Sequence, residues 1–279
     1  MADLAFQAID ALSGTVREAV INLLYRLADD ELIIGHRNSE WTGHAPILEA
    51  DIAFSSMAQD EMGHAQAYYS LLHQLGERDP DTLAFGRRPR EFRCASLVCL
   101  PKGDWGFSIL RQFLYDASET VRLTALSESS LVPLAQLAGK LRGEEKYHLM
   151  HGRSWVLRLG NATDDSHRKM QAALDFAYPH ALGLFEPTEY DEPLAQAGIS
   201  PREDELKRNG NPPWPRSSPT RVLPCRKVCR RSTEDESGNI PTRSKSSWTV
   251  CNWSTTSTRR QNGRENVKTT KRRNVGRGG

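Results

Sequence analysis

Apolar residues recur at every third or fourth position along most of the first 185 residues, which is the period of an amphipathic helix. This period predicts five helices, over residues 14–40, 46–75, 104–130, 133–159 and 165–185. Pro46 and Pro133 suit the first turns of the second and fourth helices. Gly76 is a natural stop for the second helix, and Asp104 suits the N-cap of the third. The pattern therefore indicates an all-α protein.

Two stretches lack the helical period. Residues 77–103 join the second and third helices and contain several prolines and glycines, so they predict an irregular loop. A connection of this length is informative, because antiparallel neighbouring helices usually need only a few residues between them. Residues 186–213 are rich in proline and predict irregular packing, and Pro179 is expected to bend or end the fifth helix.

Charge divides the chain near Trp214. Residues 215–279 contain 16 Lys and Arg against 4 Asp and Glu, a net charge of +12, whereas residues 1–214 contain 21 basic and 31 acidic residues, a net charge of −10. The basic part also holds 18 Ser and Thr in 65 residues and has almost no apolar periodicity. Such a composition is typical of disorder. We therefore expect a helical domain over residues 1–208 and a disordered basic tail, rich in Ser, Thr and Arg, over residues 209–279.

Several classes of protein are excluded. No apolar run approaches the about 20 residues that a membrane-spanning helix needs. The N-terminal sequence MADLAFQAID has no basic start before an apolar block, so it is not a secretory signal. Five scattered cysteines do not make a disulfide scaffold, which favours a cytoplasmic location. The basic tail could bind nucleic acid through phosphate contacts, but no recognition motif accompanies it, and this function ranks lowest.

The chemistry of the chain lies in a repeated motif. The sequence Glu-x-x-His occurs at Glu61–His64 and again at Glu145–His148, and a lone glutamate precedes each motif by one predicted helix. Residues three apart lie on one face of a helix, so each motif can direct both side chains at one metal pair. Two lone glutamates and two such motifs on four helices are the ligand set of ferritin-like di-iron or di-manganese bundles. The predicted ligands are Glu31, Glu61, His64, Glu119, Glu145 and His148.

The residue types fit two metal ions. Carboxylates are hard oxygen donors that can bridge two metals, and imidazoles supply neutral nitrogen donors that suit iron. Four carboxylates against two divalent ions make a neutral site, which a buried location requires. Asp60 and Asp116 are either partners of the imidazoles or solvated residues at the edge of the core. The alternative is that some of the six residues lie on the surface of helices whose phase differs by one or two positions.

Four stretches carry a resemblance to a known family. They are LADDELIIGHRNSEWTGHAPILEADIA (27–53), DTLAF (81–85), EEKYHLMHGRSWVLRLGNATDDSHRKMQAAL (144–174) and LFEP (184–187). In these the chain resembles the ferritin-like subunits of the bacterial ring-1,2-phenylacetyl-CoA epoxidases, and most closely the structural, non-catalytic one. The resemblance implies a ferritin-like four-helix bundle with an additional C-terminal helix. It also implies a catalytic ferritin-like partner subunit, a reductase component and phenylacetyl-CoA as substrate of the complex.

The chain departs from the family in two respects. The structural subunit of known members has lost most metal ligands, whereas this chain keeps all six. Either this branch retains two irons, with manganese as the alternative, in a structural subunit, or the chain is itself a di-iron oxidase or oxygenase. The resemblance also fades after about Arg208, close to the point where the sequence changes from acidic to basic. No histidine follows His180. A frame-shifted reading from about residue 209 is therefore an alternative to a genuine tail.

Overall fold

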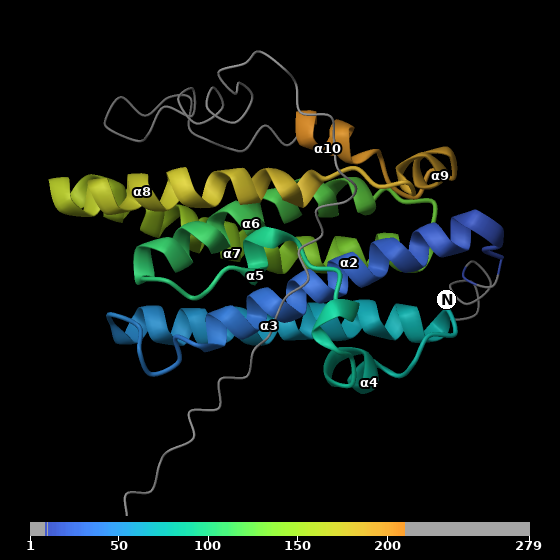
Figure 1. Cartoon of the computed structure of the whole chain (residues 1–279), viewed down its shortest axis with the longest axis horizontal. Helices are drawn as coiled ribbons and strands as arrows, with labels where there is room; N and C mark the ends of the chain where they lie inside the picture. Colours follow the sequence, from blue (N-terminus) through green and yellow to red (C-terminus); the bar gives the residue numbers. More distant parts are fainter. Residues whose placement is uncertain (1–8, 10, 210–279) are drawn as a thin grey trace, which may run out of the picture.

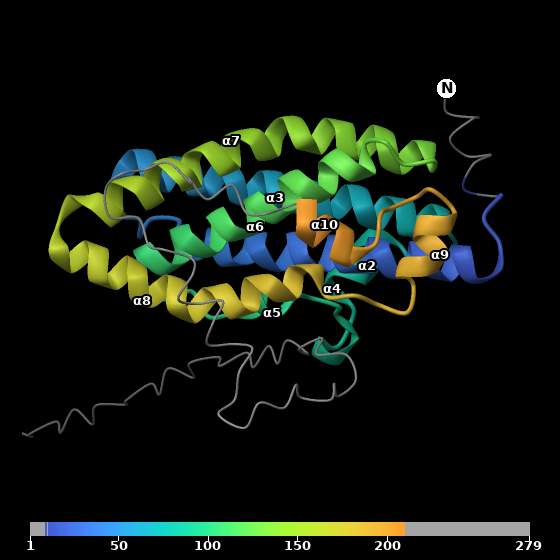
Figure 2. The same ribbon diagram turned by 90° about the horizontal axis from the view of Figure 1, so that it is seen from above.

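Four long helices form the body of this computed structural model, which describes residue 9 and residues 11–209. They are α2 (Gly14–Ser39), α3 (Leu48–Gln74), α6 (Trp105–Leu126) and α7 (Val132–Ala162). Helix α2 packs along α3, and α6 packs along α7, while α8 (Asp164–Ala181) covers both α6 and α7 (Figures 1 and 2). The described residues contain no β-strand, and the expected all-α, ferritin-like bundle is confirmed.

The connection between α3 and α6 crosses the length of the bundle, so that α6 runs parallel to α3 (Figure 1). It contains three short elements, α4 (Pro80–Phe85), η1 (Pro89–Glu91) and α5 (Ser96–Cys99), where the sequence predicts only loop. A buried ion pair attaches the crossing to α2, because the Arg87 guanidinium donates to both oxygens of Asp29. The backbone N–H of Arg93 also donates to Asp29, at 2.6 Å.

Most predicted helix boundaries are correct to within a few residues. The Asp104 side chain caps α6 by accepting from the Phe107 backbone N–H at 2.8 Å, as expected. Gly76, at φ +83°, directly follows the last turn of α3, and the N–H of Glu77 donates to the Leu72 carbonyl at 3.1 Å. The left-handed backbone is accessible to glycine, which explains why the helix stops there.

Other expectations for the elements are wrong. Pro46 lies outside α3, because Ile47 is the N-cap and the helix begins at Leu48. Helix α6 ends at Leu126, four residues early, and α7 continues through Gly160 to Ala162. Residues 186–209 are not wholly irregular, since they form α9 (Asp191–Gln196) and α10 (Glu203–Asn209) after η2 (Leu182–Phe185). The expected disordered basic tail covers residues 209–279. Residues 210–279 lie outside the described residues.

The apolar core consists of two clusters with a polar layer between them. On α3, Phe54 and Met57 belong to one cluster, and Tyr68 and Leu72 to the other. The same division holds on α7, where Val156 and Leu141 lie in different clusters. On each of these helices, the inward-facing residues between the two clusters therefore lie in one common polar layer. Among the described helices, none combines the length and apolar content that a membrane crossing requires.

A buried charge network attaches α10 to the bundle. Glu203 accepts from Arg26 of α2 at 3.0 Å and from Arg122 of α6 at 2.8 Å. Burial alone would raise the pKa of Glu203, but the two guanidinium groups lower it, so the carboxylate is ionised. The side chains of all three residues are at most 6% exposed, so the charges compensate one another without water.

Replacing this carboxylate should destabilise the protein strongly. Glu203→Ala leaves Arg26 and Arg122 buried without their shared acceptor, and removal of one partner of a buried ion pair costs about 3–5 kcal/mol. Urea unfolding measures this loss. The matched control is Asp204→Ala, which removes an exposed carboxylate one position along the same helix and should change stability by less than about 0.5 kcal/mol. Equal effects of the two variants would contradict the role of Glu203.

Candidate metal centre

The polar layer gathers all six predicted ligands into the bundle interior. Glu31 comes from α2, Glu119 from α6, and the two Glu-x-x-His motifs come from α3 and α7. Each of the six side chains belongs to a residue that is at most 3% exposed. Their helix phase is therefore the expected one, and the alternative that some of them lie on the surface is wrong.

The close approach of α2 and α3 depends on a glycine. A Cβ atom added at Gly35 would lie 3.1 Å from the Cβ of Glu61 and 3.2 Å from the carbonyl oxygen of Ala58. Gly35 lies one helical turn beyond Glu31 on α2. A larger residue there would separate the two helices at the level of the candidate ligands, so the glycine sets the width of the layer.

The first group of donors surrounds His64. Its Nδ1 atom lies 3.6 Å from Glu31 Oε2, 3.5 Å from Glu61 Oε2 and 3.5 Å from Glu145 Oε1. One ligand atom from each of these four residues lies within 4.8 Å of the others. Three carboxylates and one imidazole thus converge on a volume of the size that a metal ion occupies, and they come from three different helices.

The second group surrounds His148. Its Nδ1 atom lies 3.1 Å from Glu145 Oε1 and 3.4 Å from Glu61 Oε1. The three residues whose ligand atoms lie within 4.8 Å of one another are Glu61, Asp116 and His148. Glu61 belongs to both groups, so its carboxylate could serve both ions. The His64 and His148 ring centroids are 6.2 Å apart.

The outer nitrogens of the two histidines are held by acids from the opposite motif. His64 Nε2, on α3, lies 2.8 Å from Glu144 of α7, and His148 Nε2, on α7, lies 3.2 Å from Asp60 of α3. Each acid immediately precedes the glutamate of its own motif. A carboxylate on the outer nitrogen fixes the ring orientation and turns Nδ1 toward the layer. Asp60 is thus both an imidazole partner and a solvated residue at the edge of the core, since its side chain is 43% exposed, and Glu144, at 41%, plays the same part.

Glu119 differs from the other predicted ligands. Its Oε1 atom lies 3.4 Å from Arg122 Nε, and Glu119 is in neither group of converging donors. Asp116, one helical turn earlier on α6, is in the second group instead. The sequence shows both acids on one helix face, but it cannot show which of them the neighbouring arginine engages. The ligand role of Glu119 stays a prediction, and the geometry favours Asp116.

Burial and mutual repulsion control the ionisation of the layer. Burial, reinforced by the Glu61 carboxylate, raises the pKa of Glu31 well above its usual value. Burial would also raise the pKa of Glu61, but its close polar neighbours, Glu31 and the two histidines, hold it well below the usual range. Burial, opposed by Arg122, raises the pKa of Glu119 to about 7. The carboxylates therefore share protons rather than all being charged.

Both imidazoles carry a proton in the metal-free layer. Burial alone would lower the pKa of His64, yet the Glu31 and Glu61 carboxylates raise it to about 12. The pKa of His148 is raised in the same way by Glu145 and Glu61. Protons on the two rings thus supply part of the positive charge that the buried carboxylates require.

Unsatisfied atoms show that the residues fit a metal. Buried side-chain atoms without a hydrogen-bond partner include His64 Nδ1, both oxygens of Glu31 and one oxygen each of Glu61, Asp116, Glu119 and Glu145. A buried carboxylate oxygen without a partner is costly, and such atoms are rare in folded proteins. Divalent cations would satisfy the donor atoms of both groups at once, and the mixed carboxylate and imidazole set suits iron or manganese.

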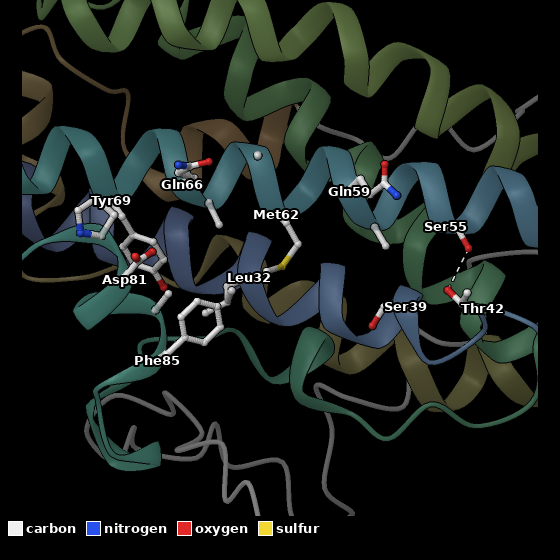
Figure 3. Close-up of a pocket in the computed structure, with 15 residues that line it drawn as sticks. Leu32, Ser39, Thr42, Ser55, Gln59, Met62, Gln66, Tyr69, Asp81 and Phe85 are labelled. Carbon is white, nitrogen blue, oxygen red and sulfur yellow. Dashed lines mark hydrogen bonds between the residues drawn. The ribbon is translucent and has the colours of Figure 1, made fainter.

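A separate surface groove of about 570 Å³ lies between α2, α3 and α4 (Figure 3). Leu32, Met62 and Phe85 line it, and Thr42 and Ser55 join across one end through a 2.9 Å hydrogen bond. None of the candidate ligands lines it. The described residues that line the groove include no lysine or arginine.

The two acids of α6 should differ in their effect on metal content. Because Asp116 is among the converging donors and Glu119 faces Arg122, Asp116→Asn is expected to lower the metal bound per chain by half. Glu119→Gln, its matched control, should leave the metal content unchanged. Elemental analysis after anaerobic reconstitution with Fe²⁺ measures both. The opposite order would restore Glu119 as the ligand.

Metal uptake should release protons. A histidine binds metal through a neutral nitrogen, so the raised pKa values of His64 and His148 make protons compete with the metal. The affinity for Mn²⁺ is therefore expected to rise with pH, by roughly tenfold per pH unit for each proton displaced. Isothermal titration at pH 6.5 and 7.5 in two buffers of different ionisation enthalpy tests this. Affinity that does not change with pH would contradict it.

Comparisons with known proteins agree with the fold. A family model described as phenylacetic acid catabolic protein matches residues 1–210. The C subunit of the 1,2-phenylacetyl-CoA epoxidase of Escherichia coli (strain K12) is 40% identical over 176 residues, which are 63% of this chain and 71% of that subunit. The family match covers the whole described bundle and most of the sequence. The chain therefore belongs to the phenylacetic acid catabolic protein family, as a homologue of an epoxidase C subunit.

Proposed function

We propose that the chain is a subunit of a multicomponent phenylacetyl-CoA 1,2-epoxidase of aerobic phenylacetate catabolism, acting in the cytoplasm. It pairs with a catalytic ferritin-like subunit, and a reductase component supplies electrons to the complex. The similarity to an epoxidase C subunit, over 71% of the length of that relative, is the observation that carries this proposal. Phenylacetyl-CoA is the substrate of the complex as a whole.

We further propose that this chain retains its own two-metal centre, of iron or else manganese. Two irons, when bound, supply dioxygen reduction chemistry of the kind that a ring epoxidation requires. Glu31, Glu61, His64 and Glu145 would hold one ion, and Glu61, Asp116 and His148 the other. The two apolar clusters on either side of the layer exclude water from these donors.

Side chains of the chain itself orient the imidazoles of this centre and balance its charge. Asp60 and Glu144 hold the outer nitrogens of the two imidazoles, so that both Nδ1 atoms face the carboxylates. The carboxylates hold protons that two divalent ions would replace, which keeps the buried layer close to neutral in either state. Arg122 keeps Glu119 paired at the edge of the layer.

A second candidate function is that the chain is a di-iron oxidase or oxygenase in its own right. The convergent donors favour it, because a purely structural subunit has no need of unsatisfied buried carboxylates. Both candidates share the fold and the metal centre. They differ in whether turnover depends on this chain's metals.

Reconstitution of the complex separates the candidates. The double variant Glu61→Gln/His148→Ala removes the shared bridging carboxylate and one imidazole. A structural subunit with this change should still co-purify with the catalytic subunit and support phenylacetyl-CoA epoxidation within about twofold of the parent, since the reacting metals lie in the partner. The epoxide product is measured by liquid chromatography.

The control is the exposed-surface variant Asp204→Ala, which should leave both assembly and turnover unchanged. Epoxidation reduced by a hundredfold or more in the double variant, with assembly intact, would make this chain the site of chemistry. Failure of the parent chain to associate with the catalytic subunit, together with full activity of that subunit alone, would contradict the structural role.

A further inference from the structure

A buried amide lies between two of the candidate ligands. Gln112 of α6 donates from Nε2 to Glu61 Oε1 at 2.8 Å and to Asp116 Oδ1 at 2.6 Å. The Gln112 side chain is fully buried. Its NH₂ group thus joins two carboxylates that both belong to the second group of donors, the one around His148.

The orientation of this amide is fixed by its surroundings. Nε2 rather than Oε1 faces Glu61 and Asp116, because an ionised Glu61 carboxylate only accepts hydrogen bonds and an amide oxygen cannot donate one. On the other side, Asn38 of α2 donates from Nδ2 to Gln112 Oε1 at 2.8 Å. Asn38 is also fully buried. Rotation of the Gln112 amide would therefore break three hydrogen bonds in a place that water does not reach.

In the first group of donors, the Gln112 amide reaches only Glu61, and there only the oxygen on the His148 side. Both oxygens of Glu31 and the Nδ1 atom of His64 lack a hydrogen-bond partner. The Glu61 oxygen that faces His64 is likewise without a hydrogen bond, whereas the Glu61 oxygen that faces His148 accepts from Gln112. The two halves of the centre are thus unequal although their motifs are alike.

We propose that Gln112 binds the carboxylates that the second metal ion would need. As a result, the donor groups around His64 and His148 bind their metal ions one after the other. This rests on the two-metal centre proposed above. The position at His64 fills first, because both Glu31 oxygens, Glu61 Oε2 and His64 Nδ1 have no hydrogen-bond partner. The position at His148 fills second, because the amide holds Glu61 Oε1 and Asp116 Oδ1 and leaves only Asp116 Oδ2 without a partner. Asn38 resists the rotation that would release the two held oxygens.

The test compares the full-length parent with Gln112→Leu, which keeps the approximate volume and removes the donors. Each protein is dialysed anaerobically against a series of Fe²⁺ concentrations, and bound iron per chain is measured by elemental analysis. The parent should bind its two irons in two separated steps. In the variant the first step should stay in place and the second should tighten by roughly tenfold, since two hydrogen bonds to carboxylates no longer compete. Gln66→Leu, a change of the same type at an exposed position of α3, should match the parent.

Thermal unfolding without metal supplies a second readout. Gln112→Leu should lower the melting temperature of the metal-free protein, because Glu61 and Asp116 lose their shared donor. The same variant should show a larger increase in melting temperature than the parent when Fe²⁺ is added, because the second ion binds more tightly. If Gln112 had only a packing role, its replacement would lower stability both without and with Fe²⁺, and the second iron would not bind more tightly.

Asn38→Ala provides a variant that touches neither carboxylate. It removes the donor to Gln112 Oε1, so the amide turns more easily and the second step should tighten, though less than in Gln112→Leu. Two irons bound with equal affinity in the parent, or a second step unchanged in both variants, would overturn the inference while leaving the two-metal centre intact. No iron in any of the proteins would overturn both proposals.

Discussion

The whole bundle depends on compensating negative charge in a layer that water does not reach. Five acids, Glu31, Glu61, Asp116, Glu119 and Glu145, lie in this layer, and each is at most 3% exposed. An uncompensated buried carboxylate costs several kcal/mol, so the fold tolerates this layer only because positive charge and protons are present. In the metal-free chain, protons on two imidazoles, one amide and Arg122 share that role. Two divalent ions would compensate the negative charge of the carboxylates more completely.

The same need for compensation attaches the outer segments of the chain to the bundle. Arg122 contacts Glu119 in the layer and also Glu203 at the start of α10, so one guanidinium connects α10 to the centre. Asp29 lies half a turn before Glu31 on α2 and receives Arg87 from the long crossing between α3 and α6. Both connections are buried ion pairs beside the candidate ligands. The parts of the structure that surround the layer are thereby coupled to its charge.

Much of this could be predicted from the sequence because it depends on local patterns. The period of apolar residues sets the helices, and i,i+3 spacing sets the two motifs, so Glu61, His64, Glu145 and His148 follow directly. What could not be predicted depends on contacts between distant segments. Asp116 and Glu119 share a helix face, and only the position of Arg122 distinguishes them. Gln112 and Asn38 are 74 residues apart, and no spacing rule connects their amides. The short helices α9 and α10 follow prolines, and α10 is held by Glu203 rather than by its own periodicity.

We propose that the layer is a working two-metal centre in a homologue of an epoxidase C subunit rather than an inherited arrangement of acids. Anomalous diffraction at the iron edge, from crystals of the protein loaded anaerobically with Fe²⁺, tests it most directly. We expect two anomalous peaks inside the bundle, one beside His64 and one beside His148, with Glu61 between them. Crystals that show no peak in the layer, or peaks only at surface carboxylates, would contradict the claim and leave the chain as a scaffold without metals of its own.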